Sequence, residues 1–289
     1  MKKIFALLLS AALLVTLLAA CGGGTTTDTD TDTQEPATDA STTQVEEQEP
    51  DTGDASKDDP LNQDEIGEKE LLVVSFGTSY NDSRRETIGA IEKAMQTAFP
   101  DYSVRRAFTS QIIIDHVKDR DGVTIDNVEQ ALERAVNNGV KTLVVQPTHL
   151  MNGLEYEELT DELAKYSDSF EKIAIGDPLL TSDADFEAVM TAITDATKDA
   201  ADGKTAICFM GHGTTADSNS VYSKMQTLLT DKGFNDYYVG TVEATPSLDD
   251  VLAAVQKGNY EKVILRPLMI VAGDHANNDM AGSEDDSWK

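Results

Sequence analysis

The apolar residues of this chain separate a polar N-terminal part from a long body in which short apolar runs alternate with amphipathic stretches. The short runs have the length of buried strands. The stretches between them carry apolar residues at helical spacing, as at Val128, Ala131, Leu132 and Ala135. Strands that alternate with helices indicate βαβ units and a parallel sheet, so the body is predicted to be an α/β fold.

The same pattern gives the expected elements of the body. Strands are predicted at residues 70–76, 102–107, 141–146, 172–175, 206–210, 237–242 and 262–271. Helices are predicted at residues 83–99, 110–118, 124–138, 155–166, 183–199, 216–231 and 247–256. Asn81 or Asp82 is predicted to be the N-cap of the first helix, and Ser182 that of the fifth.

The pattern of the first half of the body restarts in the second half. Val73–Thr78 resembles Cys208–Thr214, and two later stretches align on a proline and a glycine, with Pro147 on Pro267 and Gly153 on Gly273. This internal repeat predicts two α/β halves whose strand ends face a shared cleft.

The N-terminal part has the composition of an export signal followed by a linker. Lys2 and Lys3 precede an apolar run, which predicts a signal peptide over residues 1–20. Leu18–Cys21 resembles a bacterial lipobox, which implies a lipid anchor on Cys21 and an extracytoplasmic protein held at the membrane. An ordinary signal peptide with Ala-x-Ala cleavage is the alternative. Residues 21–68 are polar and acidic, and we expect them to form a disordered linker.

The net charge limits the possible binding partners, and the cysteine count limits the possible folds. A formal net charge of −29 argues against nucleic acid, because a polyanion would be repelled. Two cysteines, Cys21 and Cys208, cannot form a disulfide framework, and Cys208 is expected to be a small buried strand residue.

Three side chains that can bind a metal follow three strands of the second half. They are His212, Glu243 and His275, spaced about one βα unit apart. Carboxyl ends of parallel strands share one edge, where ligands bind. Two imidazoles and a carboxylate suit zinc, cobalt, iron or nickel and leave coordination positions open. We therefore predict a metal site here, with Gly211 and Gly213 allowing a large flat ligand to approach the backbone.

Each of these residues also has an ordinary structural explanation. A histidine after a strand is often a polar cap, and Glu243 could be an N-terminal carboxylate of the helix that follows it. His149 is expected near the cleft edge, either as a contact to substrate or haem or as a polar turn residue. His116 is expected on a helix surface.

Several motifs resemble those of the anaerobic-type sirohydrochlorin cobaltochelatases. They are Ser75-Phe-Gly-Thr78, Asn152–Tyr156, Met210-Gly-His-Gly213, Val242-Glu-Ala-Thr-Pro246, Pro267–Met280 and Asp286-Ser-Trp-Lys289. The resemblance runs from about residue 70 to the last residue. It implies a ferrochelatase-like fold of two Rossmann-like parallel-sheet halves, at 69–200 and 201–289, related by a pseudo-twofold around a tetrapyrrole cleft. It also implies that the C-terminal half is incomplete.

The resemblance implies insertion of Co²⁺ into sirohydrochlorin with release of two protons, a lyase reaction of anaerobic cobalamin biosynthesis. His212 would accept pyrrole protons and bind the metal, and Glu243 and His275 would be the other ligands. Ni²⁺ and Fe²⁺ are alternative metals. No organic cofactor is expected, while haem and a homo-oligomer are left open.

The carboxylates of a sirohydrochlorin-type tetrapyrrole need local cations on an acidic protein. The candidates are Arg84, Arg85, Arg105, Arg106 and Arg266, and Arg266 stands out because it directly precedes Pro267. Two other functions compete with the chelatase. One is an exported lipoprotein that binds metal or haem for uptake or storage without turnover, and the other is a solute-binding lipoprotein that needs no metal.

Overall fold

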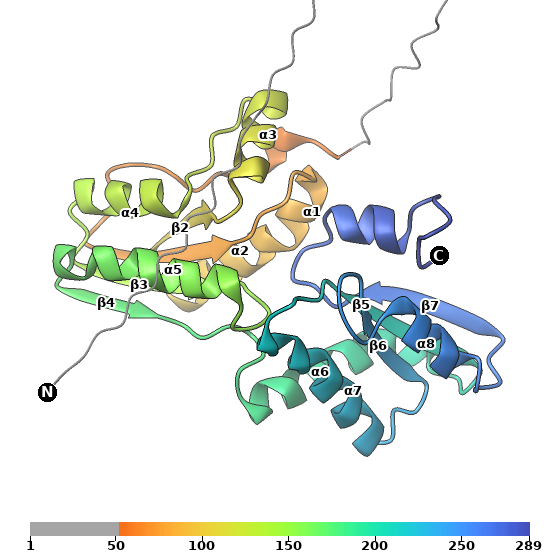
Figure 1. Ribbon diagram of the computed structural model, residues 1–289. Coiled ribbons are helices and arrows are strands. Elements are labelled where there is room, and N and C mark those ends of the chain that lie inside the picture. Colours follow the sequence, from red (N-terminus) through yellow and green to blue (C-terminus); the bar gives the residue numbers. More distant parts are fainter. Residues whose placement is uncertain (1–51) are drawn as a thin grey trace, which may run out of the picture. The chain divides into compact units, whose positions relative to one another are not determined.

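The computed structural model describes residues 52–289, so the predicted signal peptide, Cys21 and most of the predicted linker lie outside the described residues. Within residues 52–289, all strand pairs are parallel and form two sheets. The strand orders are β2-β1-β3-β4 and β6-β5-β7. The prediction of two parallel α/β halves is therefore confirmed (Figure 1).

The elements follow the apolar pattern closely. The first sheet contains β1 (Lys69–Ser75), β2 (Ser103–Phe108), β3 (Thr142–Pro147) and β4 (Lys172–Ile175), and the second contains β5 (Thr205–Gly211), β6 (Tyr237–Thr241) and β7 (Lys262–Pro267). The helices are α1 (Asn81–Glu86), α2 (Ile88–Ala98), α3 (Gln111–Asp121), α4 (Val128–Asn137), α5 (Leu154–Lys165), α6 (Asp183–Thr197), α7 (Ser220–Asp231) and α8 (Leu248–Val255). A short π-helix, η5 (Ala276–Met280), follows the last strand.

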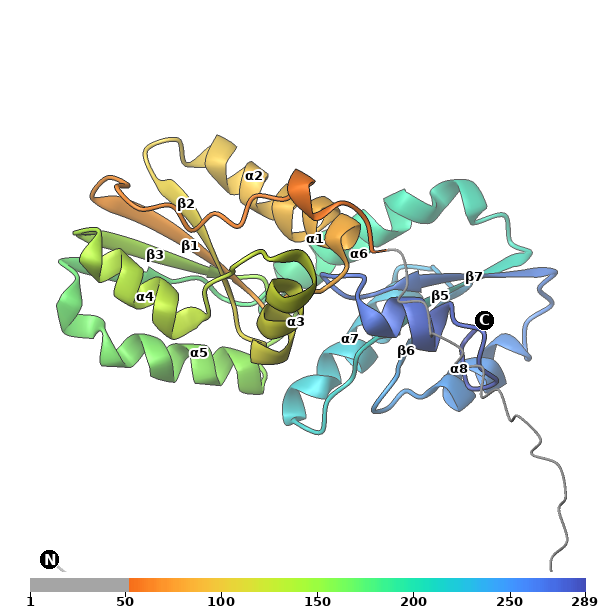
Figure 2. The same ribbon diagram turned by 90° about the horizontal axis from the view of Figure 1, so that it is seen from above.

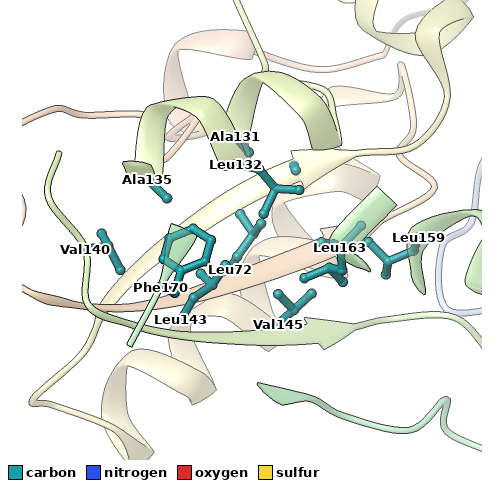
Figure 3. Close-up of a cluster of buried hydrophobic side chains, with 12 residues drawn as sticks. Leu72, Ala131, Leu132, Ala135, Val140, Leu143, Val145, Leu159, Leu163 and Phe170 are labelled. Carbon is teal, nitrogen blue, oxygen red and sulfur yellow. The ribbon is translucent and has the colours of Figure 1, made fainter. Parts of the chain in front are cut away.

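The first half is a three-layer sandwich because its central strand is buried on both faces. Leu72 and Val74 of β1 pack with α4 and α5 in the cluster of Figure 3, while Leu71 and Val73 face the other side, where Ile91 of α2 packs. Figure 2 shows α2 on one side of this sheet and α4 and α5 on the other. Successive residues of a strand point to opposite faces, so an unbroken apolar run is what a doubly covered strand requires.

The second sheet is built on the same plan around β5. Ile207 and Phe209 pack with α6 and α7, and Cys208 lies on the opposite face with Val251 of α8 and Trp288. Cys208 is buried and unpaired, as predicted. The assignment of α6 to a half differs from the prediction. The boundary expected at residue 200 puts this helix in the first half, but its apolar face packs against the second sheet through Phe186 and Met190.

The internal repeat positions the loops that join the two halves. Pro147 and Pro267 end β3 and β7 and hold the same register beside the central strands, opposite Val74 and Met210. The loop after β3 sends Met151 into the core of the second half, and the loop after β7 sends Val271 into a cluster of the first half. The halves thus exchange equivalent loops at the carboxyl edges of their sheets.

Three local predictions need correction. The helix expected at 83–99 is divided into α1 and α2, with Thr87 between them. The strand expected at 262–271 ends at Pro267, since Leu268 turns into the core of the second half and Val271 packs on a cluster of the first half. Neither Asn81 nor Asp82 is an N-cap, since both lie inside α1.

Residues 52–68 form an N-terminal strap on the first half. Asp58 is buried and forms ion pairs with Arg84 and Arg106, each at 2.6 Å. Leu61 packs with Leu71, and its carbonyl accepts a hydrogen bond at 3.3 Å from the backbone of Arg106 on β2, the edge strand. The prediction that the disordered linker runs to residue 68 is therefore wrong for this segment, because its few apolar and acidic groups find buried partners.

No helix within residues 52–289 is long and apolar enough to cross a membrane.

Glu70 predicts a pH dependence of the stability of the first half. Burial raises the pKa of this carboxyl to about 7, against an ordinary value of 4.5, and the charge of Arg105 offsets this only in part. A folded-state pKa above the unfolded one means that stability is greatest below about pH 4.5 and falls as the pH rises through 7. We expect Glu70→Gln to be more stable than the wild type at pH 8, by up to about 3 kcal/mol, and nearly equal at pH 5.

Urea unfolding at the two pH values measures this difference. Glu68→Gln is the matched control, because Glu68 lies on the surface with Lys141 and should give no such pH-dependent gain. An identical wild-type-to-variant difference at both pH values would show that Glu70 is ionised in the folded protein.

Candidate metal centre

His212 is positioned by a turn that only glycines allow. It follows Gly211, the last residue of β5. A Cβ atom on Gly211 would lie 2.1 Å from the Tyr222 ring, and one on Gly213 would lie 2.9 Å from the backbone nitrogen of Ala244. Gly213 also has a φ of +91°, which favours glycine. The structure thus gives these glycines a packing role within the protein, where the sequence suggested access for a flat ligand.

Glu243 is brought beside His212 by backbone pairing that continues past the strands. The N–H of Val242 donates to Gly211 O at 3.0 Å, and the N–H of Glu243 donates to His212 O at 2.9 Å. The amide of Asn219 donates to Thr245 O at 2.7 Å and fixes the same loop. As a result, Glu243 Oε1 lies 3.9 Å from His212 Nε2.

His275 lies in the loop after β7, at the start of η5. Asn277 and Asn278 close this loop by donating to Gly273 O at 2.8 Å and to Asp274 Oδ1 at 2.6 Å. His275 Nδ1 donates to the Asp279 carboxylate at 2.6 Å, one helical turn further on. The polar residues of this motif therefore hold the loop and orient one imidazole.

The three predicted ligands meet at one point. One ligand atom from each of His212, Glu243 and His275 lies within 4.8 Å of the other two. The two imidazole rings are 4.5 Å apart between centroids and nearly perpendicular. Metal–ligand bonds of about 2.0–2.2 Å place two ligands of one ion no more than about 4.4 Å apart. The spacing of the triad is therefore close to what one shared ion requires.

The hydrogen bonds of both imidazoles leave the same nitrogen free. His212 Nδ1 donates to Gly213 O at 2.8 Å, and a carbonyl can only accept, so the proton is on Nδ1. His275 Nδ1 is likewise committed to Asp279. Each ring thus presents an unprotonated Nε2 to the triad, which is the form that binds a metal or accepts a proton. His212 and Glu243 are about half exposed, so ions and protons can exchange with solvent.

The structure places the remaining predicted site residues elsewhere. Arg84 and Arg106 are buried and paired with Asp58, and Arg105 is buried against Gln63, so none of them can meet a substrate carboxylate. Their buried positions overturn the prediction that these three arginines bind substrate.

The other two arginines remain at the surface. Arg85 forms ion pairs with Asp82 and Glu86 on α1. Arg266 is exposed and lines a shallow pocket of about 420 Å³ with Thr197 and Lys262, and the structure does not bring it into the ligand triad. Its role in substrate binding stays a prediction.

The two remaining histidines differ in burial. Both ring nitrogens of His149 are buried without a hydrogen-bond partner among the described residues. Burial lowers the pKa of this imidazole, so the ring stays neutral near pH 7. Its contact with substrate or haem stays a prediction. His116 is exposed on α3, as predicted.

Asp279 is a residue of the candidate site that the sequence did not predict. It lies four residues after His275, the spacing at which side chains meet on a helix. That spacing was the available signal, but the predicted strand to residue 271 left no reason to expect a helix here. A carboxylate behind a ligating histidine fixes its tautomer and raises its basicity.

Comparisons with known proteins identify relatives of this chain. Residues 69–289 match the family model described as cobalt chelatase (CbiK). The sirohydrochlorin cobaltochelatase of Salmonella typhimurium is 38% identical over 221 residues, covering 76% of this chain and 83% of the relative. Sirohydrochlorin cobaltochelatase CbiKC of Nitratidesulfovibrio vulgaris is 31% identical over 223 residues, covering 76% and 78%.

A solved structure of CbiX, described as the terminal enzyme of siroheme biosynthesis in denitrifying bacteria, is a more distant match. It has a TM-score of 0.41 and 16% identity, and the match covers 69% of this chain and 91% of that one.

Proposed function

Because the chain belongs to the CbiK cobalt chelatase family and is a metal chelatase, we propose that it inserts Co²⁺ into sirohydrochlorin with release of two protons. The observation that carries this proposal is the convergence of His212, Glu243 and His275 within one ligand sphere. Cobalt is the metal named by the family and by both relatives, so it takes precedence over the Ni²⁺, Fe²⁺ and haem that the sequence left open.

The triad can hold the incoming cobalt ion loosely. Two neutral imidazoles and one carboxylate bind a divalent ion of borderline hardness and leave positions open for the nitrogens of the macrocycle. The carboxylate of Glu243 offsets part of the charge of the ion.

The same groups can receive the protons that the metal displaces. Insertion replaces two pyrrole N–H protons by one Co²⁺, so two protons must leave for each turnover. As the ion passes from the triad to the macrocycle, His212 Nε2 and the Glu243 carboxylate become free to accept the two pyrrole protons that leave. Both side chains are about half exposed and can pass these protons to water.

Turnover separates this proposal from the uptake or storage alternative. Full-length protein would be mixed without oxygen with a hundredfold excess of Co²⁺ and sirohydrochlorin, and the absorbance of the product followed. A chelatase converts many equivalents faster than a protein-free mixture does. Product that stops at one equivalent per protein would favour the storage protein instead.

The exported, lipid-anchored location is also a proposal, supported by the sequence of residues 1–21 alone. It places the reaction outside the cytoplasm, with the domain held at the membrane through Cys21. Release of the protein from the membrane fraction on Cys21→Ser substitution checks it.

A further inference from the structure

We propose that the N-terminal strap is a positioning element of the metal centre, in which Asp58 and Arg84 hold the loop after β1 as a support for the loop that carries His275. This inference rests on the proposed function, since it concerns the ligands that receive the cobalt ion. The strap contributes no ligand to the triad, and it precedes residues 69–289, the part of the chain that matches the chelatase family.

Arg84 joins the strap to the loop after β1 through a single guanidinium group. Its Nε donates to Asp58 Oδ2 at 2.6 Å, and its Nη1 donates to the carbonyl of Thr78 at 3.0 Å. Its third nitrogen, Nη2, donates to Asn81 Oδ1 on α1. The residues of this network are buried. Because the planar fork of an arginine serves all three acceptors at once, the position of Asp58 determines where the Thr78 carbonyl is held.

The strap is itself fixed by contacts on two sides of Asp58. Arg106 on β2 donates two hydrogen bonds to the Asp58 carboxylate, at 2.6 and 3.0 Å. Towards the N-terminus, the carbonyl of Gly53 accepts a hydrogen bond at 3.1 Å from the side-chain amide of Asn81, the residue whose Oδ1 binds Arg84. The carboxylate of Asp58 therefore has a fixed position, and it transmits this position to Arg84.

The loop after β1 packs closely on the loop that carries His275. A Cβ atom on Gly273 would lie 3.3 Å from Thr78 Oγ1, so the missing side chain of this glycine allows the two loops to approach. The carbonyl of Gly273 accepts hydrogen bonds from the N–H and the side-chain amide of Asn277, at 3.2 and 2.8 Å. His275 lies inside the turn that these bonds close, so Thr78 supports the base of that turn.

A second arginine binds the next carbonyl of the loop after β1. Arg120 Nη2 on α3 donates to Ser79 O at 2.5 Å, and the same guanidinium forms an ion pair with Asp121 at 2.6 Å. Tyr80, which follows, also lies near the loop of His275, because burial and the charge of Asp274 raise the pKa of its hydroxyl. Two guanidinium groups thus hold successive carbonyls of the supporting loop.

Support from the first half acts on one metal ligand more than on the other two. His212 and Glu243 are joined inside the second half, where the N–H of Glu243 donates to His212 O at 2.9 Å. His275 lies instead on a loop whose contact at Gly273 comes from the first half. A shift of this support changes the separation of the two imidazoles, which is 4.5 Å between ring centroids, and leaves the pair of His212 and Glu243 in place.

Arg84→Lys tests the connection while keeping the charge that faces Asp58. A lysine ammonium can pair with this carboxylate, but it lacks the planar fork that also reaches the Thr78 carbonyl. Titration of the full-length variant with Co²⁺ alone should give a dissociation constant about 10-fold above that of the wild type, the size expected when the support of a metal ligand is lost. The visible absorption of the bound Co²⁺ should also change, because it reports the ligand geometry. In turnover, KM for Co²⁺ should rise and KM for sirohydrochlorin should change little.

Arg134→Lys is the matched control, because it weakens a different attachment of the same strap. Arg134 pairs with Asp64 of the strap at 2.8 Å and with Asp126 at 2.7 Å, and within residues 52–289 none of these three side chains bonds to the loop after β1. This variant should bind Co²⁺ with the wild-type constant and spectrum. Asp58→Asn, at the strap end of the connection, should raise the constant by a factor similar to that of Arg84→Lys. Should Asp58→Asn not fold, Arg84→Lys decides the proposal.

A double variant shows whether the effect passes through His275. In a His275→Ala background, Arg84→Lys should cause no further loss of Co²⁺ affinity, since the ligand that it positions is already absent. Wild-type affinity and spectrum in Arg84→Lys would overturn the proposal, and so would an equal loss in Arg134→Lys or an unchanged loss in the His275→Ala background. The titration needs neither sirohydrochlorin nor turnover, so failure of the chelatase activity would be seen separately in the wild type.

Discussion

Replacement of His212 by alanine should lower the rate of cobalt insertion about 1,000-fold, because the variant loses a metal ligand and a proton acceptor at once. The hydrogen bond from Nδ1 to Gly213 O leaves Nε2 as the only basic atom that this ring offers to the triad. Anaerobic absorbance assays with Co²⁺ and sirohydrochlorin measure the rate. The circular dichroism spectrum should be unchanged, since His212 is about half exposed.

Two controls isolate the chemistry of this side chain. His116→Ala removes an exposed histidine from α3 and should leave the rate unaltered. Added imidazole should restore part of the rate in His212→Ala, because the site is open to solvent. A variant that keeps more than a third of the wild-type rate would mean that His212 neither holds the ion nor takes a proton in the slow step.

Replacement of Asp58 by asparagine should lower the free energy of unfolding by about 3–5 kcal/mol, the usual cost of breaking a buried ion pair from one side. Asp58 accepts hydrogen bonds from Arg84 at 2.6 Å and from two nitrogens of Arg106 at 2.6 and 3.0 Å. The variant would leave Arg84 without its counterion and Arg106 with Glu92 alone. Urea unfolding of the full chain measures the loss.

The pH dependence of this effect has a definite sign. Burial alone would raise the pKa of Asp58, but the hydrogen bonds and charges of Arg106 and Arg84 outweigh it and hold the pKa below the ordinary 3.8. The stabilisation is therefore present above about pH 4 and is lost as the pH falls further, through the lowered pKa. Asp183→Asn is the control, because its ion pair with Lys224 is at the surface and contributes less than about 1 kcal/mol. Equal losses in both variants would refute a special role for the strap.

The sequence predicts those parts of the structure that depend on local pattern. The central strands β1 and β5 are nearly continuous apolar runs, and Ser182, the predicted N-cap, forms a capping box with Asp185. The metal triad could be predicted because each ligand lies in the segment that follows a strand of one parallel sheet. The repeat aligned Pro147 with Pro267, and the structure gives both the same register beside a central strand.

The parts that the sequence could not predict depend on which distant groups meet. The sequence around an arginine does not show whether its side chain is exposed or buried. Arg84 and Arg106 can be buried because Asp58 lies close enough to pair with both. The strap has the composition of a disordered linker, so its few buried groups give little local signal. The sequence also does not show which of the two sheets the apolar face of α6 covers, because this helix lies between the two halves along the chain.

The exchange of loops between the halves makes the two sheets one cooperative unit, in line with the compactness of residues 50–289. Met151 packs against the core of the second half and Val271 against a smaller cluster of the first, so we expect the two halves to unfold together. Damage at the strap would consequently free the loop of His275 in the same step. The rigidity of the metal-handling groups thus depends in part on a segment that supplies none of the metal ligands.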